Sequence, residues 1–427
     1  MNILITHVYS RSNNGDAAIL ASLIAELKRV FDKPAMRIST MERAALHETF
    51  EGVPHVPSLI SAAVDGRPPV RKMASIGCSL VNTWLWAVWH RRTRRRADWL
   101  LRPEERRVLH AMADADMLVG VGGGYIQARP GVFGTIDLLL VLQTLYLAHV
   151  LGKPVALYTQ SIGPFAGSLQ ARLAAYVLNR TRLIIVRESV TQTLLQRMHV
   201  HDRLIARAAD AAFLLRKQSV HDTVPPQLAT LRQTKGTRKP AMIIGVTARN
   251  WLAPAAQAAF ERAMAKSLDD IVRTHHAHIV FIPQVTVARA ADDDRLVQRR
   301  IFEAMQEQAH ATHCDGTYSF HQVRAMYARM DYLIGNRFHS VIFALTAGVP
   351  AIAIEYEHKT GGIMADLGLR HWVIPMGKLT YSRLTQRFQK LVHGRAAYAR
   401  HLESVLPAYV RSAETAADAL TQLASTD

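Results

Sequence analysis

Short runs of aliphatic or β-branched residues alternate along this chain with longer stretches of helical periodicity. In the first half, these apolar runs fall at residues 3–6, 117–121, 155–159, 183–186 and 204–206. In the second half, they fall at residues 242–247, 278–282, 332–334 and 351–354. This alternation predicts an α/β fold, in which parallel sheets are covered by helices.

A polar stretch, "KQSVHDTVPPQLATLRQTKGTRKP", separates the two series of runs and contains two consecutive prolines. Such a stretch is typical of a linker between domains. We therefore predict two Rossmann-like domains, followed by closing helices. The predicted boundaries are residues 1–215 for the first domain, 216–240 for the linker, 241–383 for the second domain and 384–427 for the closing helices.

Ligands of open α/β sheets bind beyond the carboxyl ends of the strands, so the residues after each apolar run are candidates for a site. After the first run, "NNGDAAIL" places Asn14, Gly15 and Asp16 at the start of a helix. The backbone N–H groups there can meet an anion or a sugar hydroxyl. Plain helix capping explains Asp16 equally well.

Glycines follow the second run, in "VGVGGGYIQ". Tyr125 stands where the dinucleotide-binding pattern has its third glycine, so NAD and FAD are disfavoured. Gly123 and Gly124 allow the backbone to approach either a ligand or a neighbouring loop.

Gln160 in "TQSIGPF" comes after the third run. Arg187 comes after the fourth, as an anion ligand or in a buried salt bridge with Glu188 or Asp210.

The second series ends in cationic side chains and a histidine. Arg249 follows one run in "TARNW", Arg337 and His339 follow another in "GNRFHS", and Lys359 follows the next in "YEHK". Neighbouring parallel strands end at one edge of a sheet, so we expect Arg337, His339 and Lys359 to share one wall of a cleft. The position of His339, between an arginine and an apolar helix, favours a functional over a structural role.

Charge narrows the class of ligand. The chain has 52 Lys and Arg against 34 Asp and Glu, a net charge of +18, which predicts an anionic partner such as nucleic acid, anionic lipid or a phosphorylated small molecule. Cys78 and Cys314 have no partners at metal-ligand spacing, so neither a metal site nor a disulfide framework is expected. The first residues show no basic leader before a long apolar region, so we expect a cytoplasmic protein.

Residues 70–107 form a segment rich in Trp and Arg that fits less well into a simple two-domain enzyme. Within residues 74–96, an apolar stripe at helical spacing precedes an arginine run, and the stripe consists of Val81, Trp84, Leu85, Val88 and Trp89. Its apolar part is shorter than the roughly 20 residues that span a bilayer. A peripheral helix on an anionic membrane and an ordinary docking helix explain the pattern equally well. Specific nucleic-acid binding is disfavoured, because arginine without a stacking platform gives only non-specific attraction.

Taken in their order, the stretches "NNGDAAIL", "GVGGGYI", "QSIGPF", "RES", "DAAF", "TARNW" and "GNRFHSVIFALTAGVPAIAIEYEHKTGG" resemble the polysaccharide pyruvyl transferase family, in its exopolysaccharide branch. The resemblance implies a glycosyltransferase-B-like pair of Rossmann domains facing a cleft. It also implies phosphoenolpyruvate as donor and a pyruvate ketal as product, formed on two hydroxyls of a saccharide of the cell envelope. No separate cofactor is implied. The segment at 70–107 departs from the family core and leaves a lipid-linked acceptor open.

This activity assigns a role to each candidate residue. Phosphoenolpyruvate carries a carboxylate and a phosphate, which Arg and Lys side chains bind without a metal. The donor ligands would be Arg337, Lys359, Arg249 and Arg187. His339 would transfer protons near neutral pH. The acceptor, bound from the opposite domain, would contact Asn14, Gly15, Asp16, Gly123, Gly124 and Gln160.

Two alternatives remain at this point. A nucleotide-sugar glycosyltransferase would use the same architecture and a basic cleft. A non-catalytic, membrane-associated protein of polysaccharide assembly would use residues 74–96 as its working surface. The series of polar turns at successive strand ends favours catalysis.

Overall fold

The computed structural model describes residues 1–10, 12–42, 46, 48–63, 69–217, 224–229, 231, 241–286 and 292–424. The chain divides into two compact units. The first unit comprises Met1–Arg11, Ile19–Ala211 and Ser412–Asp427, and the second comprises Ser12–Ala18 and Ala212–Arg411. Most of the predicted linker, at 218–223, 230 and 232–240, lies outside the described residues. The units therefore differ from the predicted continuous ranges at Ser12–Ala18 and at the end of the chain.

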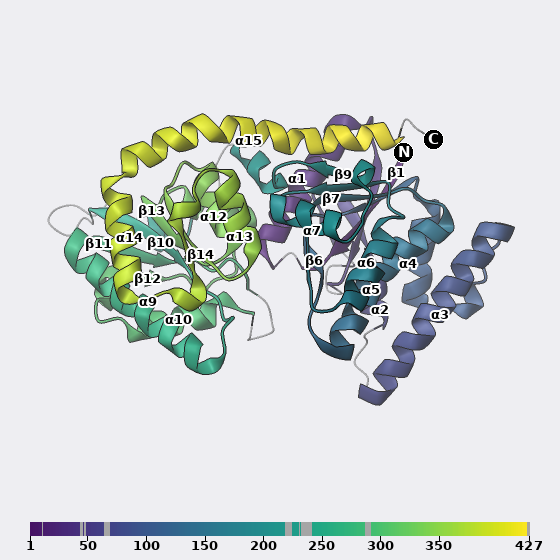
Figure 1. The fold of residues 1–427 in the computed structure, drawn as a ribbon, viewed down its shortest axis with the longest axis horizontal. Coiled ribbons are helices and arrows are strands. Elements are labelled where there is room, and N and C mark those ends of the chain that lie inside the picture. Colours follow the sequence, from purple (N-terminus) through teal and green to yellow (C-terminus); the bar gives the residue numbers. More distant parts are fainter. Residues whose placement is uncertain are drawn as a thin grey trace. The chain divides into compact units, whose positions relative to one another are not determined.

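A mainly parallel sheet forms the centre of the first unit (Figure 1). Its strands follow the order β3-β4-β2-β1-β5-β7-β8-β9, with β6 paired to β7, and only the β3–β4 pair is antiparallel. Their bounds are β1 Asn2–Val8, β2 Ala35–Thr40, β3 Thr49–Phe50, β4 Val53–Pro57, β5 Met117–Gly120, β6 Gly123–Ala128, β7 Val155–Phe165, β8 Leu183–Val186 and β9 Ile205–Arg207. The central strands are buried along their length, which explains why they read as continuous apolar runs.

Helices pack around this sheet, and α5 is central among them because it contacts α2, α3 and α6. The helices are α1 Asn14–Val30, α2 Leu59–Ala63, α3 Pro69–Thr93, α4 Pro103–Asp114, α5 Gly131–Leu151, α6 Ser168–Leu178 and α7 Ser189–Arg197, with short 3-10 turns at Asp98–Leu100 and Asp202–Leu204. Within the described ranges, α5 is the one helix long and apolar enough to cross a membrane, and 56% of its most apolar window is buried. A core helix passes the same test, so this is weak evidence for a span.

The second unit contains a fully parallel sheet in the order β12-β11-β10-β13-β14-β15. The strands are β10 Met242–Thr247, β11 Ala277–Phe281, β12 Ala311–His313, β13 Tyr332–Gly335, β14 Ala351–Glu355 and β15 Val373–Pro375. The helices are α8 Pro226–Ala229, α9 Pro254–His275, α10 Asp294–Ala304, α11 Phe320–Tyr327, α12 Phe338–Thr346, α13 His358–Asp366, α14 Tyr381–His393 and α15 Arg395–Ala424, with 3-10 turns at Ala211–Lys217, Gln308–His310, Arg370–Trp372 and Met376–Lys378. From Ser412 on, the residues of α15 belong to the first unit. Two parallel α/β sheets confirm the predicted fold class.

The predicted strands all have counterparts, but β7 differs in a way that matters for the site. The run predicted at 155–159 continues to Phe165, because β7 pairs with β6 as well as with β8. The stretch "QSIGPF" is therefore part of a strand and not a turn beyond it. The C-terminal helices α14 and α15 occupy the predicted closing segment, and α15 is the long yellow helix of Figure 1.

Candidate active site

Four neighbouring strands of the second sheet, in the order β11-β10-β13-β14, end in polar or charged residues. Arg249 follows β10, Gln284 follows β11, Arg337 follows β13 and Tyr356 follows β14. Parallel strands place their carboxyl ends at one edge of a sheet. The residues predicted from the second series therefore gather at this edge.

Arg249 lies between two aromatic rings. Its guanidinium carbon is 4.5 Å from the centroid of the Trp251 ring and 4.2 Å from that of Tyr356, which is within cation–π distance. Only 8% of the residue is exposed, and burial, reinforced by the charge of Arg337, lowers the pKa of the guanidinium. Within the described part of the chain, its Nε has no hydrogen-bond partner. The rings thus hold Arg249 in place, and its buried Nε is a donor without a partner among the described residues.

Arg337 is held by a carboxylate. Its Nε and Nη2 donate to the Asp294 carboxylate over 2.5 to 3.1 Å, and Nη2 also donates to the Asp292 carbonyl at 2.9 Å. Burial disfavours the charged guanidinium, but the attraction of Asp294 outweighs burial and raises the pKa of Arg337. The side chain is therefore fixed and charged, and it holds Asp294 through Nε and Nη2.

Tyr356 lies close to both Arg249 and Lys359 at this edge. Lys359 Nζ lies 5.7 Å from the Tyr356 ring centroid and 2.7 Å from Glu357 Oε2. Burial alone would raise the pKa of the Tyr356 phenol, but the charges of Lys359 and Arg249 outweigh burial and lower it. A phenol with a lowered pKa indicates a strongly positive environment, which suits an anionic ligand.

His339 lies in the first turn of α12 and is 9% exposed. The α-carbon of Gly15 packs directly against its ring, because a methyl group added to Gly15 would lie 2.0 Å from His339 Nδ1. Only a residue without a side chain fits at that position. The glycine of "NNGDAAIL" therefore sets the space around the candidate acid/base.

Backbone pairing brings the start of α1 to His339. Asn14 N donates to the Gln284 carbonyl at 3.1 Å, and Thr286 N donates to the Ser12 carbonyl at 3.0 Å. The prediction that Asn14, Gly15 and Asp16 belong to the opposite domain is wrong, because this pairing ties them to the second unit. Asp16 Oδ2 also accepts from Asn13 Nδ2 at 2.9 Å, and Asn13 Oδ1 accepts from Gly15 N at 3.1 Å, so Asn13 caps the start of α1 and Asp16 contacts that cap.

Gly123, Gly124, Gln160 and Arg187 belong to the first unit. Gly123 and Gly124 open β6, and Gln160 is a fully buried residue inside β7, where its Nε2 donates to the Tyr125 hydroxyl at 2.7 Å and to the Val121 carbonyl. The structure thus does not place Gln160 in a turn, since its strand continues through it.

Arg187 forms the salt bridge that was the alternative to ligand binding. Its Nη1 lies 2.5 Å from Asp210 Oδ2, its Nε donates to Ser161 Oγ at 2.7 Å, and only 1% of it is exposed. Glu188 Oε2 lies 3.6 Å from the same Nε. This arrangement gives Arg187 a structural role. Among the described residues, no group of three or more His, Cys, Asp or Glu side chains gathers as a metal site would require.

Comparison with protein-family models gives one match, which covers residues 13–358 and is described as polysaccharide pyruvyl transferase. The chain belongs to this family. Two stretches lie next to His339: the start of α1 and the turn after β13. Both fall inside the residues of this pyruvyl transferase family member that match the family model.

The family member is also similar to the amylovoran biosynthesis protein AmsJ of Erwinia amylovora. The two are 26% identical over 262 residues, which cover 60% of this chain and 60% of AmsJ. The match therefore spans less than two thirds of that relative's length.

Two solved structures with a similar fold contain bound nucleotide sugars. UDP-GlcNAc 2-epimerase from Neisseria meningitidis, bound to UDP-GlcNAc, matches with a TM-score of 0.61 at 10% identity, and the match covers all of both chains. Anabaena Alr3699/HepE in complex with UDP-glucose matches with a TM-score of 0.60 at 12% identity, again over all of both chains. Likeness at such low identity shows the fold alone, and it confirms the predicted glycosyltransferase-B-like pair of Rossmann domains.

Sequence reasoning missed three residues of this edge. Trp251 and Tyr356 stood in quoted stretches, but only the structure shows that both rings hold Arg249. Asp294 begins α10, 43 residues before its partner Arg337, and no local pattern connects the two. Aromatic residues directly after strands were the signal that could have identified the first two.

Proposed function

We propose that this protein transfers the pyruvyl group of phosphoenolpyruvate onto two hydroxyls of a saccharide, forming a pyruvate ketal. The observation that carries the proposal is the cluster of Arg249, Arg337 and Lys359 around Tyr356, at the same sheet edge as His339. Family membership supplies the reaction class.

Whether each cation already pairs with a carboxylate indicates which one binds the donor. Arg249 is held by aromatic rings and, among the described residues, forms no ion pair, whereas Arg337 and Lys359 each pair with a carboxylate. Arg249 therefore offers its charge and its donors to the phosphate or carboxylate of phosphoenolpyruvate. Arg337 and Lys359 add positive potential beside it.

The reaction needs a proton at the methylene carbon of phosphoenolpyruvate, which makes C2 electrophilic. One saccharide hydroxyl then adds to C2, the C2–O bond to phosphate breaks, and a second hydroxyl closes the ketal. Of the two hydroxyl protons, one balances the proton delivered to carbon and the other leaves with phosphate. His339 is our candidate for these transfers, and the cations stabilise the departing phosphate.

For the acceptor, the proposal retains Gly15 and Asp16, because the start of α1 lies against His339. The amylovoran protein suggests that the saccharide is an exopolysaccharide or its precursor. Phosphoenolpyruvate is a cytoplasmic metabolite, so we place the reaction in the cytoplasm.

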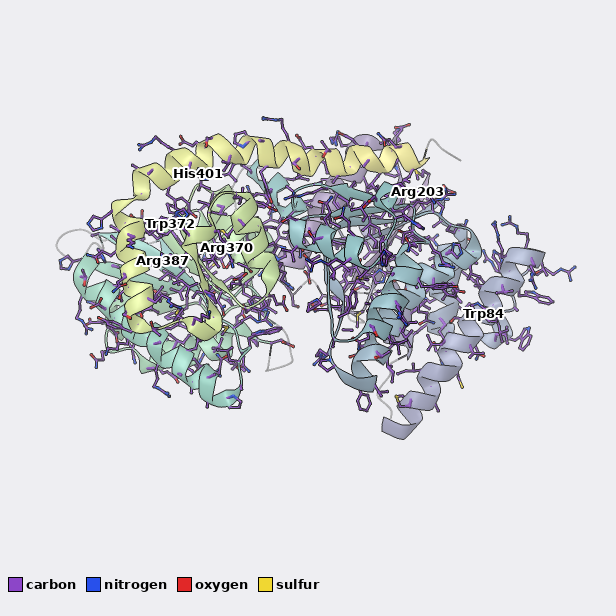
Figure 2. The ribbon with its side chains drawn as sticks, viewed as in Figure 1. Trp84, Arg203, Arg370, Trp372, Arg387 and His401 are labelled. Carbon is purple, nitrogen blue, oxygen red and sulfur yellow. The ribbon has the colours of Figure 1, made fainter. Side chains whose placement is uncertain are left out.

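Calorimetric titration tests the donor. We expect saturable binding of phosphoenolpyruvate, and a loss of about 10- to 100-fold in affinity in Arg249→Gln, as for a hydrogen bond to a charged group. Arg203→Gln removes an exposed arginine of the first unit and serves as the matched control (Figure 2). Binding of UDP or GDP in place of phosphoenolpyruvate would reject the proposal in favour of a nucleotide-sugar glycosyltransferase.

Phosphate release tests the chemistry. With a panel of saccharide acceptors, the wild type should release phosphate from phosphoenolpyruvate. His339→Gln should bind the donor as the wild type does and should release phosphate about 100- to 10,000-fold more slowly. If His339→Gln keeps most of the turnover, the assignment of the acid/base is refuted.

A further inference from the structure

The apolar side chains of α3 divide between two faces. Thr83, Trp86 and Ala87 are buried on the face that packs into the first unit. Most of the stripe predicted from the sequence lies on the other face, where Trp84 is 42% and Trp89 49% exposed. Val81 and Leu85 are exposed in the same way, and Val88 is half-buried. The helix docks on the protein and still presents an apolar surface; Figure 2 labels Trp84 on it.

An apolar groove begins at Trp84. It lies between α3, α5 and α6 and has a volume of about 280 Å³. Its walls include Leu80 and Trp84 of α3, Leu139 and Leu142 of α5, and Leu173 and Tyr176 of α6. An apolar cavity of about 150 Å³ already holds benzene. The groove therefore has room for part of a hydrocarbon chain.

Cationic side chains lie beside the groove and at the end of α3. The guanidinium carbon of Arg180 is 3.5 Å from the centroid of the Tyr176 ring, which lines the groove. Arg92, Arg94 and Arg95 are exposed, and among the described residues no ion pair is found for them, whereas Arg96 pairs with Asp114. Both regions carry positive charge that suits the phosphate of a lipid headgroup.

We propose that the groove takes a hydrocarbon chain of an anionic membrane lipid and that the exposed face of α3 docks the first unit on the membrane surface. Tryptophan and leucine beside arginine is the pattern of helices that lie in the membrane interface. An apolar groove gives no contacts to a nucleic acid, and the arginine cluster favours an anionic surface over an apolar face of another protein. The proposal does not depend on the pyruvyl transfer proposed above.

Vesicle sedimentation of the full chain tests the docking. We expect binding to vesicles of phosphatidylcholine with phosphatidylglycerol, weaker binding at high salt, and little binding to phosphatidylcholine alone. The double variant Trp84→Glu/Trp89→Glu should bind at least tenfold more weakly. Leu296→Glu, which alters a similarly exposed apolar residue of the second unit, is the control and should bind as the wild type does. No binding to anionic vesicles, or equal binding by the double variant, overturns the proposal.

Lipids brominated in their chains test the groove itself. They should quench tryptophan fluorescence, and Trp84→Phe should lose the part of this quenching that comes from Trp84, while Trp251→Phe should retain it. Leu173→Phe narrows the groove without adding charge, and it should reduce quenching while the protein still sediments with anionic vesicles. Unchanged quenching in both Trp84→Phe and Leu173→Phe would refute chain insertion. Thermal unfolding checks that each variant is folded.

Discussion

Replacing Gly15 by alanine is the sharpest perturbation of the candidate site. The new methyl group would lie 2.0 Å from His339 Nδ1 and 2.4 Å from Cγ, whereas ordinary contact begins at 3.4 Å. The imidazole must therefore move by about 1.4 Å, or α1 must shift by a similar distance. A misplacement of about 1 Å in a catalytic group reduces the rate roughly 100-fold. We expect a loss of that order in turnover.

The same change should affect stability much less. Overpacking costs about 1–3 kcal/mol, but alanine in place of glycine inside a helix returns up to about 1 kcal/mol, and Gly15 is the second residue of α1. Gly167→Ala is the matched control, since a methyl group there meets nothing within 4 Å. It should leave turnover and melting temperature near the wild-type values.

Phosphate release under saturating donor measures the effect, and a double-mutant cycle identifies its route. If Gly15 acts through the ring, Gly15→Ala/His339→Gln will be no slower than His339→Gln alone. Phosphoenolpyruvate binding should persist in Gly15→Ala, because the atoms nearest to the new methyl group all belong to His339 and none to Arg249. Wild-type turnover in Gly15→Ala would refute the positioning of His339 by this contact.

Three further results are expected. Asp210→Asn leaves Arg187 buried without the Asp210 carboxylate, so it should lower the free energy of unfolding by about 3–5 kcal/mol in urea titrations. Donor binding by the folded protein should be unchanged. The control Asp114→Asn removes one partner of an exposed ion pair and should cost less than about 1 kcal/mol. Burial lowers the pKa of His7 to about 4, despite the hydrogen bond of its ring to the Val141 carbonyl. The unfolded chain therefore binds the proton more readily, and the free energy of unfolding falls by about 3 kcal/mol as the pH drops from about 6.5 to about 4. This part of the pH dependence should vanish in His7→Gln. In ultraviolet titrations, a phenol that ionises below the ordinary tyrosine pKa should disappear in Tyr356→Phe, and bound phosphoenolpyruvate should raise its pKa by neutralising the nearby cations.

Patterns of local sequence were enough to predict the strands that carry the site. Strands such as β10 and β13 are short, apolar and buried on both faces, so periodicity and length identify them. The strands β2 and β4 were not predicted. In β2, "AMRIST", apolar residues alternate with polar ones, and β4, "VPHVP", contains two prolines. The rule that parallel strands end at one edge then predicted that Arg337, His339 and Lys359 share one wall of a cleft.

What the sequence could not provide was the pairing between distant segments. The hydrogen bond between Asn14 and Gln284 joins residues about 270 positions apart, and it moves the start of α1 from the predicted first domain into the second unit. Arg187 and Arg337 look alike in sequence, since each follows a strand. Each pairs with a buried aspartate, Arg187 with Asp210 and Arg337 with Asp294, and local patterns reveal neither partner.

The partners of the cations also indicate how the site is kept stable before a donor arrives. Three cations lie close together at this edge, and the charge of Arg337 adds to burial, the main cause, in lowering the pKa of Arg249. Asp294 and Glu357 offset the repulsion between these cations at Arg337 and Lys359, so both side chains remain ordered but partly neutralised. Arg249 is stabilised by the faces of Trp251 and Tyr356, which hold a cation without cancelling its charge. An anionic donor therefore meets its strongest uncompensated attraction at Arg249, which is why that residue, and not the more obvious Arg337 beside His339, should dominate donor affinity.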